Sequence, residues 1–204
     1  MRVFERLSRR RLVLAAVALV WAGLSGEWVP SGLARAQTAQ PPATVLLIRH
    51  AEKLTDGRPD LSPVGFERAK AIPELFGGAG AAVPHNLPRP DFLFATHVSK
   101  NSNRPVETIT PLSQALGLPI SSQIDDKDFA TLAAELLSGK YAGKVVLVAW
   151  HHGSLPGLAR ALGAAPPYDP WPETQFDRVW RIDYRDGKAT LTDLPQRLMP
   201  GDSQ

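Results

Sequence analysis

The sequence predicts an α/β fold: a three-layer α/β/α sandwich around a mostly parallel central sheet, with an antiparallel edge strand or hairpin at the C-terminal end. Three short aliphatic runs, residues 43–48, 91–96 and 144–150, have the length of strands buried on both faces. Segments with helical spacing separate these runs, as in a parallel sheet. Residues 176–194 instead alternate polar and apolar side chains around an Asp-Gly turn at 186–187, which predicts an antiparallel hairpin.

The first helix is predicted to begin at Ser62-Pro63, because serine is a good N-cap and proline suits the first helical position. Its apolar stripe comprises Phe66, Ala69, Ile72, and Leu75 or Phe76. The glycine pair at 77–78 should end this helix. Residues 78–90 are rich in glycine and proline and should form an exposed loop.

Three more helices are predicted between the later strands. Residues 105–116 should form one that is kinked at Pro111 and ended by Gly117. Residues 128–137 and 155–162 should form two shorter ones, each followed by a glycine. We expect the last two to cover the sheet.

Length and composition favour one domain with a substantial core, since the chain has 204 residues and 44% hydrophobic content. We divide it into a leader at 1–36, a linker at 37–43, a catalytic domain at 44–195 and a tail at 196–204. Cysteine is absent, which excludes disulfides and a thiolate metal site.

The leader is predicted to be an export signal peptide. Residues 1–11 are basic, residues 12–24 are apolar, and residues 34–36 (Ala-Arg-Ala) have the spacing of a cleavage site. Residues 8–13 also resemble a twin-arginine motif. An uncleaved anchor is the alternative, but the apolar run is shorter than the ~20 residues of a membrane-spanning helix. We therefore expect a periplasmic or secreted protein with no stable membrane anchor after cleavage.

The charge of the chain argues against nucleic acid as a partner. The leader holds six arginines and two glutamates, so the net charge of +3 becomes about −1 once it is removed. The remaining domain has no excess of basic residues for a polyanion.

Chemistry is predicted at one edge of the sheet, where basic side chains follow the strands. Arg49 and His50 end the first aliphatic run, His151 ends the third, and Arg104 follows the second at the start of a helix. Guanidinium groups match phosphate oxygens and stabilise the charge of a transferring phosphoryl group. Neighbouring arginines should also lower the pKa of His50, leaving a neutral ring nitrogen that can attack phosphorus.

Four ordered blocks carry a family resemblance. Residues 49–52 (Arg-His-Ala-Glu) match the signature Arg-His-Gly/Ala-Glu, and residues 61–65, 104–112 and 146–163 resemble the blocks that follow it. The chain thus resembles the histidine phosphatase, or phosphoglycerate-mutase-like, superfamily over residues 44–184.

The resemblance implies an exported phosphatase that hydrolyses a phosphomonoester or phosphoprotein through a phosphohistidine. In that family His50 would be the nucleophile, Arg49 and Arg104 would clamp the phosphate oxygens, and His151 would contact the transferring group. Glu52 would have a supporting role, and no cofactor is implied. The acid that protonates the leaving group stays open among Glu107, Asp125, Asp126 and Asp128.

A second interpretation is a catalytically weak or inactive phosphate-binding or interaction module of the same fold. A metal site is not expected, because His151 and His152 are adjacent on an extended chain and face opposite ways. His85 and His97 are predicted to be hydrogen-bonded surface residues, while Lys53 could face either an anionic substrate or solvent. Three tryptophans are assigned to packing: Trp150, Trp171 and Trp180.

Overall fold

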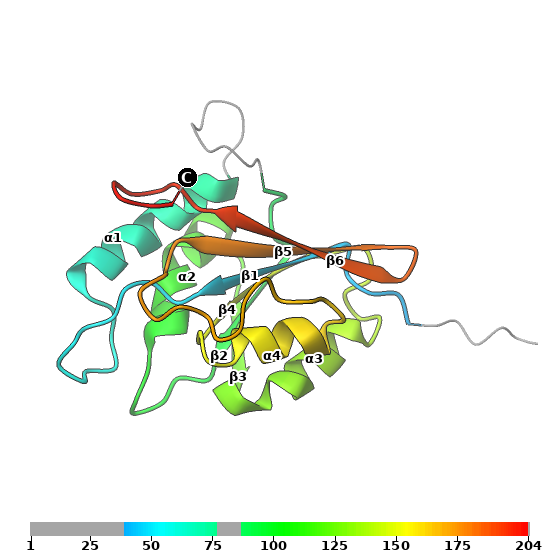
Figure 1. Ribbon diagram of the computed structural model, residues 1–204, viewed down its shortest axis with the longest axis horizontal. Coiled ribbons are helices and arrows are strands. Elements are labelled where there is room, and N and C mark those ends of the chain that lie inside the picture. The colour runs from blue at the N-terminus through cyan, green and yellow to red at the C-terminus, as the bar shows by residue number, and fades with distance from the viewer. Residues whose placement is uncertain (1–38, 77–86, 204) are drawn as a thin grey trace, which may run out of the picture. The chain divides into compact units, whose positions relative to one another are not determined.

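The computed structural model describes residues 39–76 and 87–203, which contain one six-stranded sheet in the order β3-β2-β4-β1-β5-β6 (Figure 1). Strands β1 to β4 pair in parallel, β5 pairs antiparallel with β1, and β6 pairs antiparallel with β5 at the edge. The strands are β1 Thr44–Arg49, β2 Phe92–Thr96, β3 Ile120–Ile124, β4 Val145–Trp150, β5 Arg178–Arg185 and β6 Lys188–Pro195. The predicted parallel sheet with a C-terminal antiparallel hairpin is confirmed.

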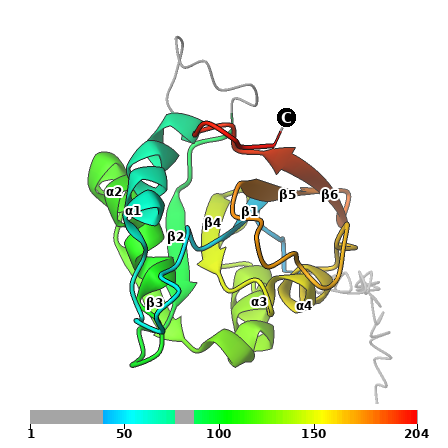
Figure 2. The ribbon, with the colours of Figure 1, turned by 60° about the vertical axis from the view of Figure 1, so that its left-hand side comes forward.

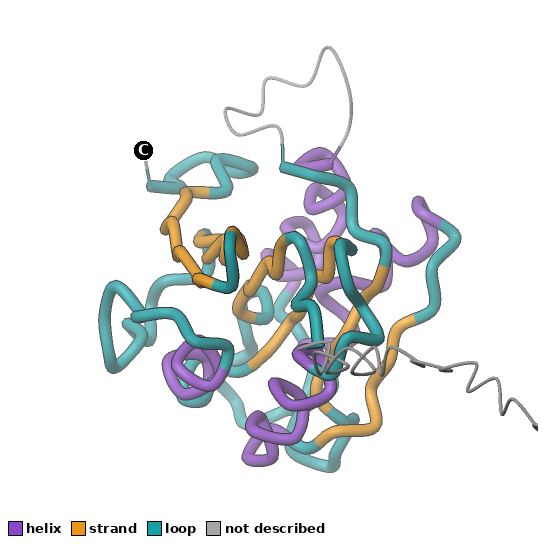
Figure 3. The backbone as a smooth tube through the Cα atoms, turned by 90° about the vertical axis from the view of Figure 1, so that its right-hand side faces the viewer, coloured by secondary structure: helices purple, strands orange, loops and turns teal. Residues whose placement is uncertain are grey.

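Helices cover both faces of the sheet, which confirms the three-layer sandwich (Figure 2, Figure 3). Helices α1, η1 and α2 pack on one face, while α3 and α4 pack on the other. The helices are α1 Pro63–Ala71, η1 Ile72–Phe76, α2 Arg104–Leu116, η2 Asp126–Asp128, α3 Phe129–Leu137 and α4 Leu155–Ala161.

The sequences of the central strands are continuous apolar runs because both faces of these strands are buried. In β1, Val45 and Leu47 enter the core beneath α3 and α4, while Leu46 and Ile48 enter the core beneath α1 and α2. All four side chains are fully buried. Fully buried aliphatic side chains each contribute about 1.5–3 kcal/mol, so the central strands are fixed in register by both layers.

Helix α1 begins as predicted, since the Ser62 hydroxyl accepts a hydrogen bond from the Gly65 amide at 3.1 Å. The predicted apolar stripe is wrong at Phe66, which is 40% exposed. Gly65 packs against the segment after β1 instead, and a Cβ at that position would overlap the Glu52 carbonyl oxygen. This close approach fixes the rotation of the helix and directs Phe66 outward.

Helix α2 continues through Pro111. It ends at Gly117, whose φ of 67° is in the left-handed region. Strand β3 follows immediately and was not predicted. Its sequence, Ile-Ser-Ser-Gln-Ile, lies at the edge of the sheet and is mostly half-buried, so it lacks the aliphatic run of the central strands.

The C-terminal hairpin turns at Asp186 and Gly187, which both have positive φ, as a tight two-residue turn requires. After β6 the tail packs back onto the domain, because Gln196 is fully buried and Asp202 binds Arg68.

The predicted leader, most of the loop at 78–90, and His85 lie outside the described residues. Within residues 39–76 and 87–203, no helix has the length and apolar character needed to cross a membrane.

Candidate active site

Two histidines meet where adjacent strands end. His50 follows β1 and His151 follows β4, and the His50 amide donates to the Trp150 carbonyl at 3.0 Å. Their rings lie edge to face with centroids 5.1 Å apart. The prediction that both imidazoles share one edge of the sheet is confirmed.

His50 is held in one tautomer. It is 1% exposed, and its Nδ1 lies 2.7 Å from the Ala51 carbonyl oxygen. Because a carbonyl oxygen can only accept, Nδ1 carries the proton and Nε2 keeps its lone pair. Burial lowers the pKa of His50 well below 6.5, with smaller contributions from His151 and the arginines. Burial therefore lowers this pKa more than the neighbouring arginines do, whereas the sequence had suggested the arginines as the cause.

Helix α2 fixes the backbone beside His50. The Ala51 amide donates to the Thr108 hydroxyl at 2.9 Å, and that hydroxyl donates to the Arg104 carbonyl at 2.7 Å. Thr108 is fully buried. Sequence reasoning did not single out Thr108, although it lies four residues after Arg104, the spacing at which a threonine hydroxyl reaches back along a helix.

Arg49 is a buried cation with one side satisfied and one side free. Its Nη1 donates to the carbonyls of Pro172, Glu173 and Gln175 at 3.0, 2.7 and 3.0 Å. Its Nε and Nη2 are buried and have no hydrogen-bond partner within the described part of the chain. Burial lowers the pKa of Arg49 to about 10, which leaves it cationic at neutral pH.

Arg104 begins α2 and faces the same cluster. Its Nη1 donates to the carbonyls of Arg58 and Pro59 at 3.3 and 3.4 Å, while its Nε is buried and unpartnered among the described residues. Burial lowers its pKa, and its charge in turn contributes to lowering the pKa of His50 and His151. The structure thus brings together the four residues selected from the sequence.

His151 and its neighbour His152 both have a lowered pKa. Burial lowers the pKa of His151 to about 4, against the opposing effect of Asp126. Burial also lowers the pKa of His152, followed by the charge of Arg49.

The structure separates the four candidate acids. Asp126 is half-buried, its charge acts on His151, and its Oδ1 is buried without a partner among the described residues. Glu107 accepts a hydrogen bond from the Leu61 amide at 2.8 Å, and burial raises its pKa. Asp125 and Asp128 are exposed.

Glu52 is engaged by a buried ion-pair network. Its carboxylate accepts from Arg68 Nη2 at 2.8 Å, and the same nitrogen contacts Asp202 at 2.7 Å. Arg68 is 5% exposed, so this network ties the segment after His50 to α1 and to the C-terminal tail. Lys53 is exposed on the same segment.

Across residues 39–76 and 87–203, no three His, Asp or Glu side chains cluster as a metal site would require. His97 is exposed, with its Nδ1 3.2 Å from the Ser122 carbonyl, as predicted for a surface histidine. The three tryptophans are buried in the core, as predicted: Trp150, Trp171 and Trp180.

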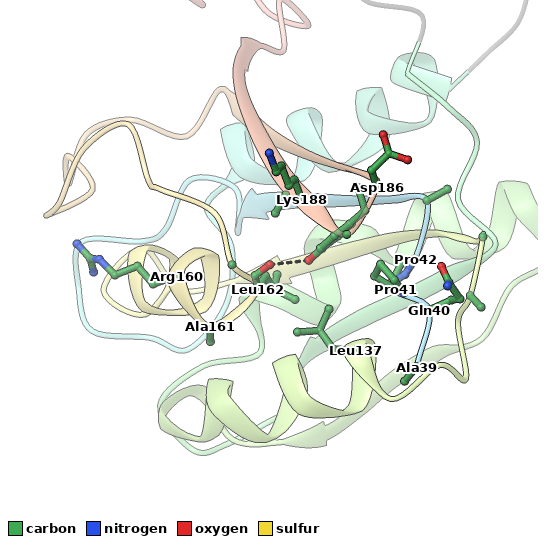
Figure 4. A pocket seen from close by; sticks show the side chains of 17 residues that line it. Ala39, Gln40, Pro41, Pro42, Leu137, Arg160, Ala161, Leu162, Asp186 and Lys188 are labelled. Carbon is green, nitrogen blue, oxygen red and sulfur yellow. Dashed lines mark hydrogen bonds between the residues drawn. The ribbon is translucent and has the colours of Figure 1, made fainter. Parts of the chain in front are cut away.

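A hollow lies at the opposite end of β1 and β4 from the histidines. This cleft, of about 1560 Å³, is lined by residues 39–43, 160–163 and 186–189, together with Leu137, Ala142, Gly143 and Tyr184 (Figure 4). Tyr184 is one of these lining residues, and its hydroxyl donates to the Leu162 carbonyl at 2.8 Å. None of the predicted site residues lines it.

No protein-family model matches this sequence, and no curated protein matches it either. Solved structures do resemble it. The α/β fold of this chain, with its six-stranded sheet, is shared by a protein of known structure.

One similar structure is YhfR of Bacillus stearothermophilus, with a TM-score of 0.51, 16% identity, and coverage of 73% of this chain and 95% of that chain. A phosphoserine phosphatase of Entamoeba histolytica has a TM-score of 0.48, 12% identity, and coverage of 76% and 97%. The α-ribazole phosphatase of Shigella flexneri has a TM-score of 0.45, 16% identity, and coverage of 78% and 100%. At these identities the similarity concerns the fold.

Proposed function

We propose that this protein is a phosphatase that hydrolyses a phosphomonoester through a phosphohistidine on His50. One observation carries the proposal: a neutral, buried imidazole whose Nε2 keeps its lone pair lies beside a buried arginine whose Nε and Nη2 have no partner among the described residues. An uncompensated buried guanidinium is costly, and a phosphate dianion would supply both charge and acceptors.

In the first step, His50 Nε2 attacks phosphorus and the bond to the ester oxygen breaks. Arg49 and Arg104 hold the non-bridging oxygens, and neutral His151 donates a hydrogen bond to one of them. Water then attacks the phosphohistidine and gives a proton to the carboxylate that had protonated the leaving oxygen; the P–N bond breaks, which releases orthophosphate and restores the lone pair on Nε2.

We assign the proton donor for the leaving oxygen to Asp126. Its buried Oδ1 has no partner among the described residues, and its charge acts directly on His151. Glu107 already accepts from the Leu61 amide, which suits a role in holding the backbone beside Arg104. Asp125 and Asp128 are exposed, whereas Asp126 is half-buried.

The test is to trap the intermediate. We would mix the chain from Gln37 onward with a radiolabelled phosphomonoester, quench in alkali, and measure label that is stable to base and labile to acid. Wild-type protein should carry this label and release phosphate, and His50→Ala should do neither. His97→Ala replaces an exposed histidine and is the matched control.

Orthophosphate binding without turnover of any ester would instead support the inactive binding module. Label that persists in His50→Ala would place the nucleophile elsewhere. A panel of sugar phosphates, nucleotides and phosphopeptides would then separate a small phosphorylated substrate from a phosphoprotein.

We further propose that the protein is exported to the periplasm or secreted. The support is the basic start, the apolar run and the Ala-Arg-Ala at residues 34–36. Expression of the full chain should yield an extracytoplasmic product that begins at Gln37. Replacing Arg9 and Arg10 by lysine should keep the protein inside if the twin-arginine route is used.

A further inference from the structure

The segment Pro172–Phe176 surrounds one side of Arg49. Three of its carbonyl oxygens, from Pro172, Glu173 and Gln175, accept from the single nitrogen Nη1 at 2.7 to 3.0 Å. These contacts join residues more than 120 positions apart in the sequence. The two N–H groups of Nη1 are thereby consumed by backbone acceptors.

The aromatic ring of Phe176 also contacts the Arg49 guanidinium. The Arg49 Cζ lies 3.9 Å from the centre of the phenyl ring, well within cation–π distance. The same ring lies 6.1 Å from the His50 ring, tilted by 52°. Phe176 therefore restricts rotation of the guanidinium beside the nucleophile.

The segment is itself anchored in the core. The Trp171 indole N–H donates to the Gln175 carbonyl at 2.9 Å. Trp171 is 1% exposed and packs against Trp180 and Tyr168, with ring centroids 4.5 and 5.6 Å away. One carbonyl that holds Arg49 is thus fixed by a fully buried tryptophan.

We infer that Phe176 is a positioning residue for the phosphatase reaction, and that the Pro172–Phe176 segment presents the Nε–Nη2 edge of Arg49 to the phosphate. That edge is the one left unpaired among the described residues, and it is the edge that can bind two phosphate oxygens side by side. The inference rests on the proposed function, because it assumes that Arg49 binds phosphate.

The test is orthophosphate affinity, measured by titration calorimetry, which does not require turnover. Phe176→Leu keeps an apolar side chain but removes the aromatic face, and should weaken phosphate binding about tenfold, or ~1.4 kcal/mol. Phe176→Tyr keeps the face and should bind within about twofold of wild type. Phe66→Leu, the same substitution at an exposed site on α1, should also stay within about twofold.

A double-mutant cycle separates positioning from general destabilisation. Lysine lacks the planar fork, so in an Arg49→Lys background Phe176→Leu should change phosphate affinity by less than about twofold. Trp171→Phe retains the packing but loses the bond to Gln175, and should weaken binding by a smaller factor than Phe176→Leu. If Phe176→Leu does not fold, the loss of phosphate affinity in Trp171→Phe still tests whether this segment positions Arg49.

Equal affinity of Phe176→Leu and wild type would overturn the inference, as would an equal loss in the Arg49→Lys background. A wild-type protein that binds no phosphate would overturn the proposed function instead. The two failures are therefore distinguishable in one set of titrations.

Discussion

The two ends of the parallel strands differ in how their polar groups are satisfied. At the carboxyl end, Arg49 is 1% exposed and keeps two nitrogens unpaired within the described part of the chain. At the other end, the cleft has a volume of about 1560 Å³, yet its Arg160 pairs with Asp169 at 2.7 Å and its side chain is 54% exposed. Tyr184 there donates to Leu162. Since β1 has six residues, the two regions lie ~20 Å apart.

The difference shows that the size of a hollow does not identify the reactive end of this molecule. Leaving a buried donor unpaired costs about 1–3 kcal/mol, more for a charged group, so such a cluster persists only where something offsets the cost. A bound dianion would offset it. In the cleft, Arg160 and Tyr184 are both paired, so neither is a buried donor without a partner. We therefore expect substitutions there to affect stability rather than catalysis.

The largest contrast should come from removing one arginine at each end. Arg49→Ala should lower kcat/KM about 10²–10³-fold, because it removes preorganised donors from the developing phosphoryl charge. Arg160→Ala should leave kcat/KM within about twofold, because that side chain is exposed and paired at the surface. Steady-state kinetics on an aryl phosphate measure both. If both variants lost kcat/KM to a similar extent, the proposed difference between the two regions would be wrong.

The next effect should distinguish two aspartates. Asp126→Asn should lower kcat about 10²-fold on an alkyl phosphate, and less on an ester with a good leaving group, because it removes the general acid. Asp186→Asn, in the hairpin turn beside the cleft, should be neutral, since asparagine also suits a positive φ. A loss at Asp126 that is independent of the leaving group would argue against its role as acid.

A third effect concerns acid stability. Burial lowers the pKa of His151 to about 4, while an unfolded histidine titrates near 6.5. Between these values the unfolded state binds a proton that the folded state does not, so the free energy of unfolding falls as pH falls from 6.5 toward 4.

Between pH 7 and pH 5, the free energy of unfolding of wild type should therefore fall by about 1–2 kcal/mol more than that of His151→Gln. Urea unfolding at the two pH values measures this difference. His97→Gln replaces an exposed histidine and should follow the wild-type curve. If His151→Gln follows the wild-type curve as well, the burial of His151 does not weaken the folded state in acid.

The parts of the site that follow from local sequence were predictable, and the parts that depend on distant contacts were not. An aliphatic run that ends in Arg49-His50 places both residues at the end of a strand, because the apolar pattern itself determines where the strand lies. Strand β3 has no such run: it is at the sheet edge, and its polar centre needs no burial.

Phe176 and Arg68 illustrate the contacts between distant residues that the sequence did not predict. Phe176 meets Arg49 across 127 positions, and Arg68 meets Asp202 across 134, so neither contact leaves a local periodicity. The outward direction of Phe66 likewise depends on the contact between Gly65 and Glu52, which a helical stripe does not contain. The basic cluster was therefore visible in the sequence, while the groups that orient it were not.

The smallest expected effect lies in the cleft. Tyr184→Phe removes one hydroxyl, which donates to the Leu162 carbonyl at the end of α4. It should lower the free energy of unfolding by about 1 kcal/mol, the usual net contribution of one such hydrogen bond. Phosphate affinity and kcat should not change, because β1 and β4 separate the cleft from the histidines. Urea unfolding and phosphate titration on the same preparation measure both, and a change in phosphate affinity would show that the two ends are energetically coupled.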